Sequence, residues 1–380
     1  MSVKFMSVPF VSSRIMSTFA EKAMLLNQFD SRFPTEESCE AYFRSVREEV
    51  GVTCRSCQSK EHKWIAGRKC FECLKCGHRT PLTAGTVMEY SKLPLRTWFY
   101  TAHLMTSIKQ VLSAKEVQHQ LSISYPPVWL MMMKLRDIMG KRENMYTLSG
   151  EVELDEAFFP TRMKGDEKDE PLKRGAGSQR QTKVLVIVES KPADELLVTY
   201  LESLLASYSD AKVRKVANLE KKVAKNAGVK KAVNYIKMFV LENLESGTIE
   251  RIAGRFIDKD AKVVTDGSKS HVKFKTLFNI HESHVEYDAA SVVKTNLPWV
   301  HIVIGECRSG IEAIHKEVEQ GFLQLYLNEY CWKFNRRFFR DSTNPKYDLF
   351  DRLIKISAMF TSDIKYDRNA EDTSDIEYDM

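Results

Sequence analysis

Gly150–Pro160, GEVELDEAFFP, combines a β-strand pattern with an unusual density of acidic residues. Apolar Val152, Leu154 and Phe158 are two or four residues apart and so point to the same face, as expected of a strand with one buried face. Four carboxylates fall within six residues, at Glu151, Glu153, Asp155 and Glu156. Because a buried carboxylate without a partner is costly, the acids of this strand predict a functional site.

Strand and helix patterns alternate downstream of this stretch. The order predicted is three strands, a helix, a strand, a helix, a strand and a last helix. The runs that carry these patterns are 150–160, 182–190 and 234–244 (strands), 246–258 (helix), 261–266 (strand), 268–279 (helix), 283–287 (strand) and 306–339 (mostly helix). This order predicts an α/β domain of RNase H-like fold.

Three acids fall at positions that converge in such a fold. Asp155 lies on the first strand, Asp266 ends the fourth, and Glu306 lies on a helix predicted to start near residue 305. Gathered carboxylates repel one another, and divalent cations relieve that repulsion. Oxygen ligands suit Mg²⁺ or Mn²⁺, and a metal pair can carry out phosphodiester chemistry. Taken singly, each acid is also explained by a solvated strand end or helix start, which is the interpretation we favour for Glu153 and Glu156.

The cysteines predict a second metal site. Five of the eight lie between Cys54 and Cys76, a clustering that favours metal binding in a reducing compartment over disulfides. Two C-x2-C pairs, fifteen residues apart, match a four-thiolate structural zinc site. The predicted zinc ligands are Cys54, Cys57, Cys73 and Cys76.

Alternatives to this ligand set exist nearby. Cys70 could pair with Cys73, and His62 or His78 could substitute for a thiolate. Gly77 favours Cys76, because a knuckle needs a permissive backbone after its second cysteine. The lysines and arginines that surround the cysteines indicate phosphate contacts, with a solvated ribbon surface as the alternative.

Residues 113–139 resemble a helix-turn-helix. Ser113 can cap the first helix, with Glu116 three residues later as in a capping box. The second helix is then expected to present Val128 and Trp129 to DNA. A helical hairpin without a DNA contact is the alternative.

Length and charge fit several domains and a nucleic-acid partner. The chain has 380 residues and a net charge of +6. It has no apolar run long enough to cross a membrane, so we expect no membrane partner. We expect a cytoplasmic, nucleoid-associated protein. The predicted organisation is an N-terminal extension and helical segment (1–50), a zinc ribbon (51–90), the helix-turn-helix region (91–147), the catalytic domain (148–345) with a Lys-rich insertion at about 200–235, and a C-terminal segment with an acidic, disordered tail (346–380).

Together these motifs resemble DDE-class insertion-sequence transposases of bacteria, in particular the group with an N-terminal zinc ribbon and an ISXO-like catalytic domain. The resemblance runs from about residue 29 to residue 339. It rests on CRSC…CLKCG, PLTAGTVMEYSKLPLRTWF, SAKEVQHQLSIS, ELDEAFF, VVTDGSKSH, LPWVHIVIGECR and LQLYLNEYCWKFNRRFF. It implies catalytic roles for Asp155 and Asp266, for Glu306 as the third residue, and for Arg308 as the basic residue after it. The run after Arg308 reads as more continuously helical than in relatives, which makes Glu312 an alternative third ligand.

The resemblance also implies substrate and partners. These are double-stranded DNA at the terminal inverted repeats and at the target, Mg²⁺ or Mn²⁺ for strand cleavage and transfer, Zn²⁺ for the ribbon, and a homo-oligomer on paired ends. The Lys-rich insertion, the basic loop 163–183, and Arg336 and Arg337 could contact DNA or serve as surface and packing residues. A catalytically inactive DNA-binding protein and an RNase H-like nuclease are the alternative functions.

Overall fold

The computed structural model describes residues 23–108, 110–162, 178–196, 209, 211, 213–214, 217–218, 231–271, 273–284, 297–337 and 348–365. It divides into two compact units, Glu143–Asp348 and Met24–Arg142 with Leu349–Met380, called here the sheet unit and the cysteine unit. The predicted N-terminal extension, the acidic tail and most of both the basic loop and the Lys-rich insertion lie outside the described residues.

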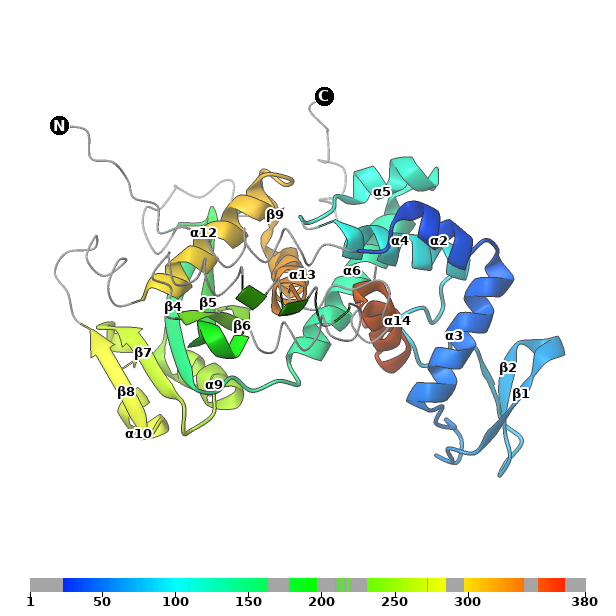
Figure 1. Ribbon diagram of the computed structural model, residues 1–380, viewed down its shortest axis with the longest axis horizontal. Coiled ribbons are helices and arrows are strands. Elements are labelled where there is room, and N and C mark those ends of the chain that lie inside the picture. Colours follow the sequence, from blue (N-terminus) through cyan, green and yellow to red (C-terminus); the bar gives the residue numbers. More distant parts are fainter. Residues whose placement is uncertain are drawn as a thin grey trace. The chain divides into compact units, whose positions relative to one another are not determined.

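The sheet unit is built on a mixed sheet (Figure 1). Its strands are β4 (Glu151–Arg162), β5 (Gln181–Pro192), β6 (Lys231–Val240), β7 (Lys262–Asp266) and β8 (Ile280–His284). Their spatial order is β6-β5-β4-β7-β8. The first three strands pair antiparallel, and β7 and β8 extend the sheet in parallel from β4. This is the strand order expected of an RNase H-like α/β domain, so the fold prediction is confirmed.

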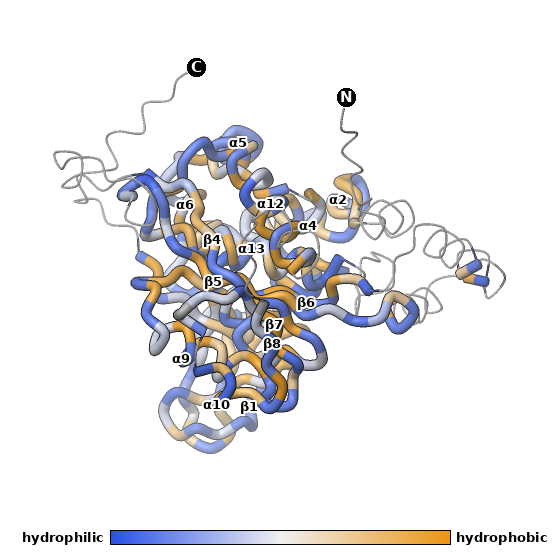
Figure 2. Tube along the Cα trace, turned by 90° about the vertical axis from the view of Figure 1, so that its left-hand side faces the viewer, coloured by the Kyte–Doolittle hydropathy of each residue, from blue (hydrophilic) through white to orange (hydrophobic). Residues whose placement is uncertain are grey.

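Side chains of β4 alternate between two covered faces, as the strand period requires. Val152 and Leu154 join a core with residues of α9 (Ser246–Phe256) and α10 (Phe274–Leu277). The central strands are accordingly among the apolar segments coloured orange in Figure 2. On the other face α12 (Pro298–Glu312) packs on β4 and β5.

The start of α12 differs from the prediction. The helix begins at Pro298, not near residue 305, with proline in its first turn, where a missing N–H costs nothing. The buried Glu153 carboxylate accepts hydrogen bonds of 2.9 Å from the backbone N–H groups of Trp299 and Val300. A carboxylate at a helix N-terminus is favourable, and this contact from a distant strand sets where the helix begins. The prediction that Glu153 is solvated was therefore wrong.

The segments around α12 also depart from the sequence patterns. The helix expected over 268–279 is limited to the short η4 (Lys269–His271) and α10, and β8 begins three residues before the predicted strand. The helix expected to run on after Arg308 ends at Glu312. A two-residue strand, β9 (Val318–Glu319), then pairs with the end of β4, and η5 (Gln320–Phe322) leads into α13 (Leu323–Asn335), which packs on β6.

Aromatic side chains form the core of the cysteine unit. They come from α2 (Leu26–Arg32), the linker after it, α4 (Leu95–Ser107) and α14 (Leu349–Met359). Phe350 of α14 packs edge-on or tilted against three of these rings. The sequence placed α14 only in a C-terminal segment, whereas it completes the core of residues more than 200 positions earlier.

The remaining helices and the ribbon follow their local signals. Thr35 caps α3 (Glu36–Val50), and Ser113 accepts a hydrogen bond from Glu116 N at the start of α5 (Ala114–Leu121). After the left-handed Ser122 comes α6 (Tyr125–Glu143), in which Val128 is fully buried. Val128 therefore cannot contact DNA as predicted. The small sheet has the order β1 (His62–Ile65), β2 (Cys70–Cys73), β3 (Arg79–Pro81), with η1 (Ala66–Arg68) between its first two strands. Among the described residues, no helix has the length and apolarity needed to cross a membrane.

Candidate active site and zinc site

Asp155 and Asp266 lie side by side at the ends of neighbouring strands. In the parallel pairing of β4 with β7, Leu154 is opposite Thr265, so the two aspartates form the next pair in register. Neighbouring strands are about 4.8 Å apart, and residues in register point to the same face. Two residues 111 positions apart in the sequence are thus brought together by strand register, as the sequence predicted.

The charge around Asp155 is strongly negative. Burial of its carboxyl, together with the charges of Asp266 and Glu156, raises the pKa of Asp155 to about 7. One oxygen, Oδ1, accepts a hydrogen bond of 2.8 Å from the backbone N–H of Glu156. Such repulsion between buried carboxylates is what a divalent cation relieves, so the donor set fits a cation.

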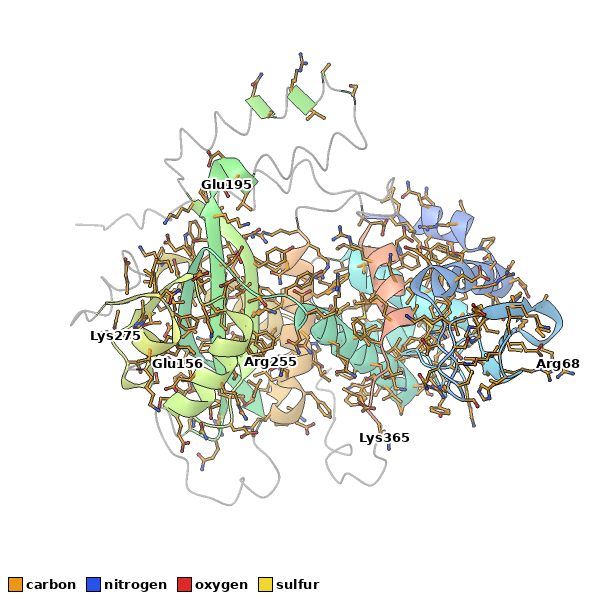
Figure 3. The ribbon with its side chains drawn as sticks, turned by 90° about the horizontal axis from the view of Figure 1, so that it is seen from below. Arg68, Glu156, Glu195, Arg255, Lys275 and Lys365 are labelled. Carbon is orange, nitrogen blue, oxygen red and sulfur yellow. The ribbon has the colours of Figure 1, made fainter. Side chains whose placement is uncertain are left out.

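Asp266 is compensated from the opposite side by His271. The contact with His271 and the backbone N–H of Ser268 hold the pKa of Asp266 below its usual value, in spite of its burial. Burial opposes protonation of His271, but Asp266 and Glu156 outweigh it and raise the pKa of the imidazole to about 9. Glu156, labelled in Figure 3, is therefore a partner of this site and not a solvated strand residue.

His301 of α12 also lies beside the aspartate pair, next to Asp155. Its Nδ1 lies 3.7 Å from Oδ2 of Asp155. Burial lowers the pKa of His301, against the opposing charge of Asp266, and so favours the neutral imidazole, which retains a lone pair. Its Nε2 is buried without a hydrogen-bond partner among the described residues. No motif in the sequence singled out His301. The only signal was its place seven residues, or two helical turns, before Arg308.

Glu306 points away from the aspartates. At about 100° per residue it lies about 140° around α12 from His301 and about 200° from Arg308, both of which face β4. Burial raises the pKa of Glu306 to about 7, against the charge of Arg337, and the Glu306 charge in turn affects the buried Tyr330 of α13. The structure therefore does not bring Glu306 to Asp155 and Asp266. The reason is the packing of α12. Its buried face, formed by Val300, Val303, Cys307 and Ile311, lies between the side that carries His301 and the side that carries Glu306.

The predicted basic residues are held by protein groups. Arg308 donates from Nη2 to the carbonyl of Phe158 on β4, and its guanidinium lies 5.6 Å from the ring centre of Phe159. Arg336 pairs with Glu143 at 2.5 Å. Arg337 donates to backbone carbonyls at the start of β6. Arg336 and Arg337 are thus packing residues, and Arg308 ties α12 to the strand that carries Asp155.

In the cysteine unit, four thiols gather as the C-x2-C spacing predicts. The ligand atoms of Cys54, Cys57, Cys73 and Cys76 all lie within 4.8 Å of one another. Two of the Sγ–Sγ distances are 3.6 and 3.5 Å. A zinc ion with Zn–S bonds of about 2.3 Å holds its four sulfurs about 3.8 Å apart, so the cluster needs little adjustment.

Both knuckles have matching backbone geometry. The N–H of Gln58 donates to the carbonyl of Cys54, and that of Gly77 to the carbonyl of Cys73, each at 2.9 Å. Gln58 and Gly77 both have left-handed backbones, with φ of 61° and 72°. The expectation that a permissive residue follows Cys76 is met. Burial opposes ionisation of Cys73, but backbone N–H groups outweigh it and lower its pKa to about 6, which favours the thiolate that binds metal.

Cys70 lies outside this cluster. It is buried in β2, opposite Ile65 and Pro81 in the strand register. The alternative pairing of Cys70 with Cys73 is thus not the one that the fold assembles.

Comparison with known proteins identifies a transposase-family domain in the sheet unit. Residues 147–335, which contain both aspartates and His301, match the family of ISXO2-like transposase domains. Through this domain the chain belongs to the insertion-sequence transposases. It is also 28% identical over 166 residues to an uncharacterized protein in transposable element ISH50 of Halobacterium salinarum. That match covers 41% of this chain and 55% of the relative, so the chain spans about half the length of that relative. No solved structure matches the chain.

Proposed function

We propose that the protein is a DNA transposase that cleaves the ends of its insertion sequence and joins them to target DNA. The observation that carries the proposal is the register pairing of Asp155 with Asp266 on β4 and β7, within a transposase-family domain. Bound Mg²⁺ or Mn²⁺ would activate the attacking oxygen and stabilise the leaving oxygen of the phosphodiester. The two aspartates hold the cation, and the same residues serve cleavage and transfer.

His301 is the third active-site residue in this proposal, in place of Glu306. Among the described contacts, it is the α12 side chain nearest to Asp155. Burial favours its neutral form, which is the form that can bind a cation. Imidazole suits transition metals better than Mg²⁺, whose ligands are usually oxygens. We therefore expect Mn²⁺ to support cleavage better than Mg²⁺. The backbone contact of Arg308 keeps the His301 face of α12 against β4.

The cysteine unit is the proposed DNA-binding part, with Zn²⁺ as a structural ion. Its ribbon exposes many cations, of which Arg55, Lys63, Lys69 and Arg79 form ion pairs with nearby glutamates. Lys60, Arg68 and Lys75 are exposed and have no ion pair among the described residues. Arg68 lies at the tip of the β1–β2 hairpin (Figure 3). These three side chains are the ones most available to phosphates.

The helix pair α5–α6 is a second proposed DNA contact. Lys115 and His119 are exposed on α5, and Trp129 near the start of α6 is half-buried. The proposed contact uses these side chains rather than the buried Val128. Two chains acting on paired ends complete the proposal.

A cleavage assay tests the proposal directly. Full-length protein is incubated with Mn²⁺ and a supercoiled plasmid that carries the flanking repeats of the element. Asp155→Asn and Asp266→Asn are expected to reduce nicking about 10³-fold, because each removes a charge that holds the cation. Asp260→Asn, in an exposed turn before β7, is the matched control and should cleave normally.

The outcomes also separate the alternative functions. End-specific binding without any Mn²⁺-dependent nicking would indicate the inactive DNA-binding protein. Nicking that is indifferent to the repeats and extends to RNA–DNA hybrids would indicate a nuclease. Either result would overturn the proposal.

A further inference from the structure

His271 is a buried imidazole enclosed between two carboxylates. Its side chain is only 1% exposed. Nδ1 lies 3.1 Å from Oδ1 of Asp266, and Nε2 lies 3.1 Å from Oε1 of Glu156. Both contacts are within ion-pair distance, although neither ring nitrogen has a hydrogen-bond partner of good geometry among the described residues. The ring thus bridges the end of β7 to β4.

Two serines add hydrogen bonds on either side of this bridge and connect to each other. The backbone N–H of Ser268 donates to Oδ1 of Asp266 at 3.1 Å, and Ser270 Oγ donates to Oε1 of Glu156 at 2.9 Å. The two serine hydroxyls contact each other at 2.8 Å. The turn that follows Asp266 is therefore fastened to Glu156 of the neighbouring strand.

These contacts all involve one oxygen of each carboxylate. Oδ1 of Asp266 and Oε1 of Glu156 each already accept a hydrogen bond from a serine and face His271. Oδ2 of Asp266 has no hydrogen bond or ion pair in the described part of the chain. An aspartate held through one oxygen presents the other in a defined direction, which is how outer-shell partners orient metal ligands.

We propose that His271, anchored by Glu156, is a positioning residue that fixes the side chain of Asp266 so that its second oxygen is presented to the cation shared with Asp155. This inference rests on the proposed metal site. The ligand atoms of His271, Glu156 and Asp266 lie within 4.8 Å of one another and could themselves hold an ion. In the arrangement proposed here, His271 acts through Asp266 and does not bind the cation.

Manganese binding to the full-length protein without DNA tests the role. Mn²⁺ affinity is measured by electron paramagnetic resonance, alongside the melting temperature in EDTA. His271→Ala is expected to weaken Mn²⁺ binding about 10- to 100-fold, as is usual for outer-shell partners. Glu156→Gln should weaken it similarly, and Ser270→Ala by less. His271→Gln, which keeps a polar group in the space, should recover part of the affinity.

His281→Ala is the matched control. His281 also lies in the sheet unit and contacts β7, with Nε2 2.9 Å from Thr265 Oγ1, but neither acid is among its described contacts. It should bind Mn²⁺ like the wild type. If His281→Ala and His271→Ala lose affinity equally and both melt lower in EDTA, the effect is general destabilisation and the positioning role is wrong.

Other results separate this inference from the proposed function. Unchanged affinity in His271→Ala and Ser270→Ala, with affinity lost in Asp266→Asn, would overturn the positioning role alone. Unchanged affinity in Asp266→Asn itself would overturn the metal site. A ¹⁴N coupling to Mn²⁺ that is lost in His271→Ala but kept in His301→Ala would make His271 a ligand, and would also overturn the inference.

Discussion

The four-cysteine cluster and the aspartate pair both gather groups that can bind a metal, but they are assembled differently. The four thiols lie within 23 residues, and two similar turns hold them together. The aspartate site needs the register of two strands and the rotation of a helix that starts 143 residues after Asp155. A local site is therefore specified by its spacing, whereas a long-range site depends on contacts that no short motif contains.

The largest effect is expected at the local site. Cys73→Ser, or removal of zinc by a chelator, should unfold the ribbon and abolish specific end binding, because structural zinc contributes about 10 kcal/mol or more to small folds. Circular dichroism and zinc content are the measurements. The sheet unit should keep its secondary structure.

Cys70→Ser is the control for this prediction, since Cys70 is a neighbouring cysteine outside the cluster. It should retain about one zinc ion per chain. Loss of zinc in Cys70→Ser but not in Cys76→Ser would show that Cys70, and not Cys76, is the zinc ligand that pairs with Cys73.

At the long-range site, the deciding comparison is between two residues of α12. His301→Ala should reduce Mn²⁺-dependent nicking by about 10²-fold or more, because it removes the group beside Asp155. Glu306→Gln should stay within a few-fold of wild type, since Glu306 faces Arg337. Initial nicking rates in Mn²⁺ and Mg²⁺ measure both.

His301→Asp sharpens the same comparison, because a carboxylate in this place should shift the metal preference toward Mg²⁺. The reverse pattern, with Glu306→Gln inactive and His301→Ala active, would mean that α12 is rotated from the position described.

A smaller effect is expected on DNA affinity. Replacing Lys60, Arg68 and Lys75 together by alanine should weaken binding at low salt and reduce the salt slope by about three, because each lysine or arginine on a phosphate contributes about one. Fluorescence anisotropy at several salt concentrations gives the slope. Replacing the ion-paired Lys63 and Lys69 should change the salt slope less. An unchanged slope in the triple variant would exclude Lys60, Arg68 and Lys75 as a DNA-binding surface.

The smallest expected effect is a pH dependence of stability in the sheet unit. Burial raises the pKa of Glu153 to about 7, although two backbone N–H groups of α12 oppose it. The folded state thus holds a proton that the unfolded state releases between about pH 4.5 and 7. The free energy of unfolding should therefore fall as the pH rises through this window. Urea denaturation of the metal-free protein measures it.

Glu153→Gln should make this dependence shallower while still accepting hydrogen bonds from α12. The rest of the slope should remain, because burial also raises the pKa values of Asp155 and Glu306 to about 7. A profile that stays as steep as the wild type would assign the titration to another group, such as Asp155.

The parts that the sequence predicted are those governed by short periodicities. Alternation in β4, the terminal position of Asp266 on β7 and the order of strands and helices together predicted that the two aspartates lie side by side. The rotation of α12 was not predictable, because it depends on Glu153, a residue 145 positions before Pro298 that we interpreted as solvated. The face of α12 that packs on the sheet decides which side chain faces Asp155, and that face was not evident from the residues near Glu306 alone. The placement of α14 was missed for the same reason, since its partners lie more than 200 residues earlier.

Diffraction from crystals containing Mn²⁺ would locate the proposed cation directly. If the two aspartates share it, an anomalous peak should lie about 2.1 Å from a carboxylate oxygen of both Asp155 and Asp266, on the side where His301 lies. A peak bound by Glu306, or one that touches only one of the two aspartates, would contradict this arrangement.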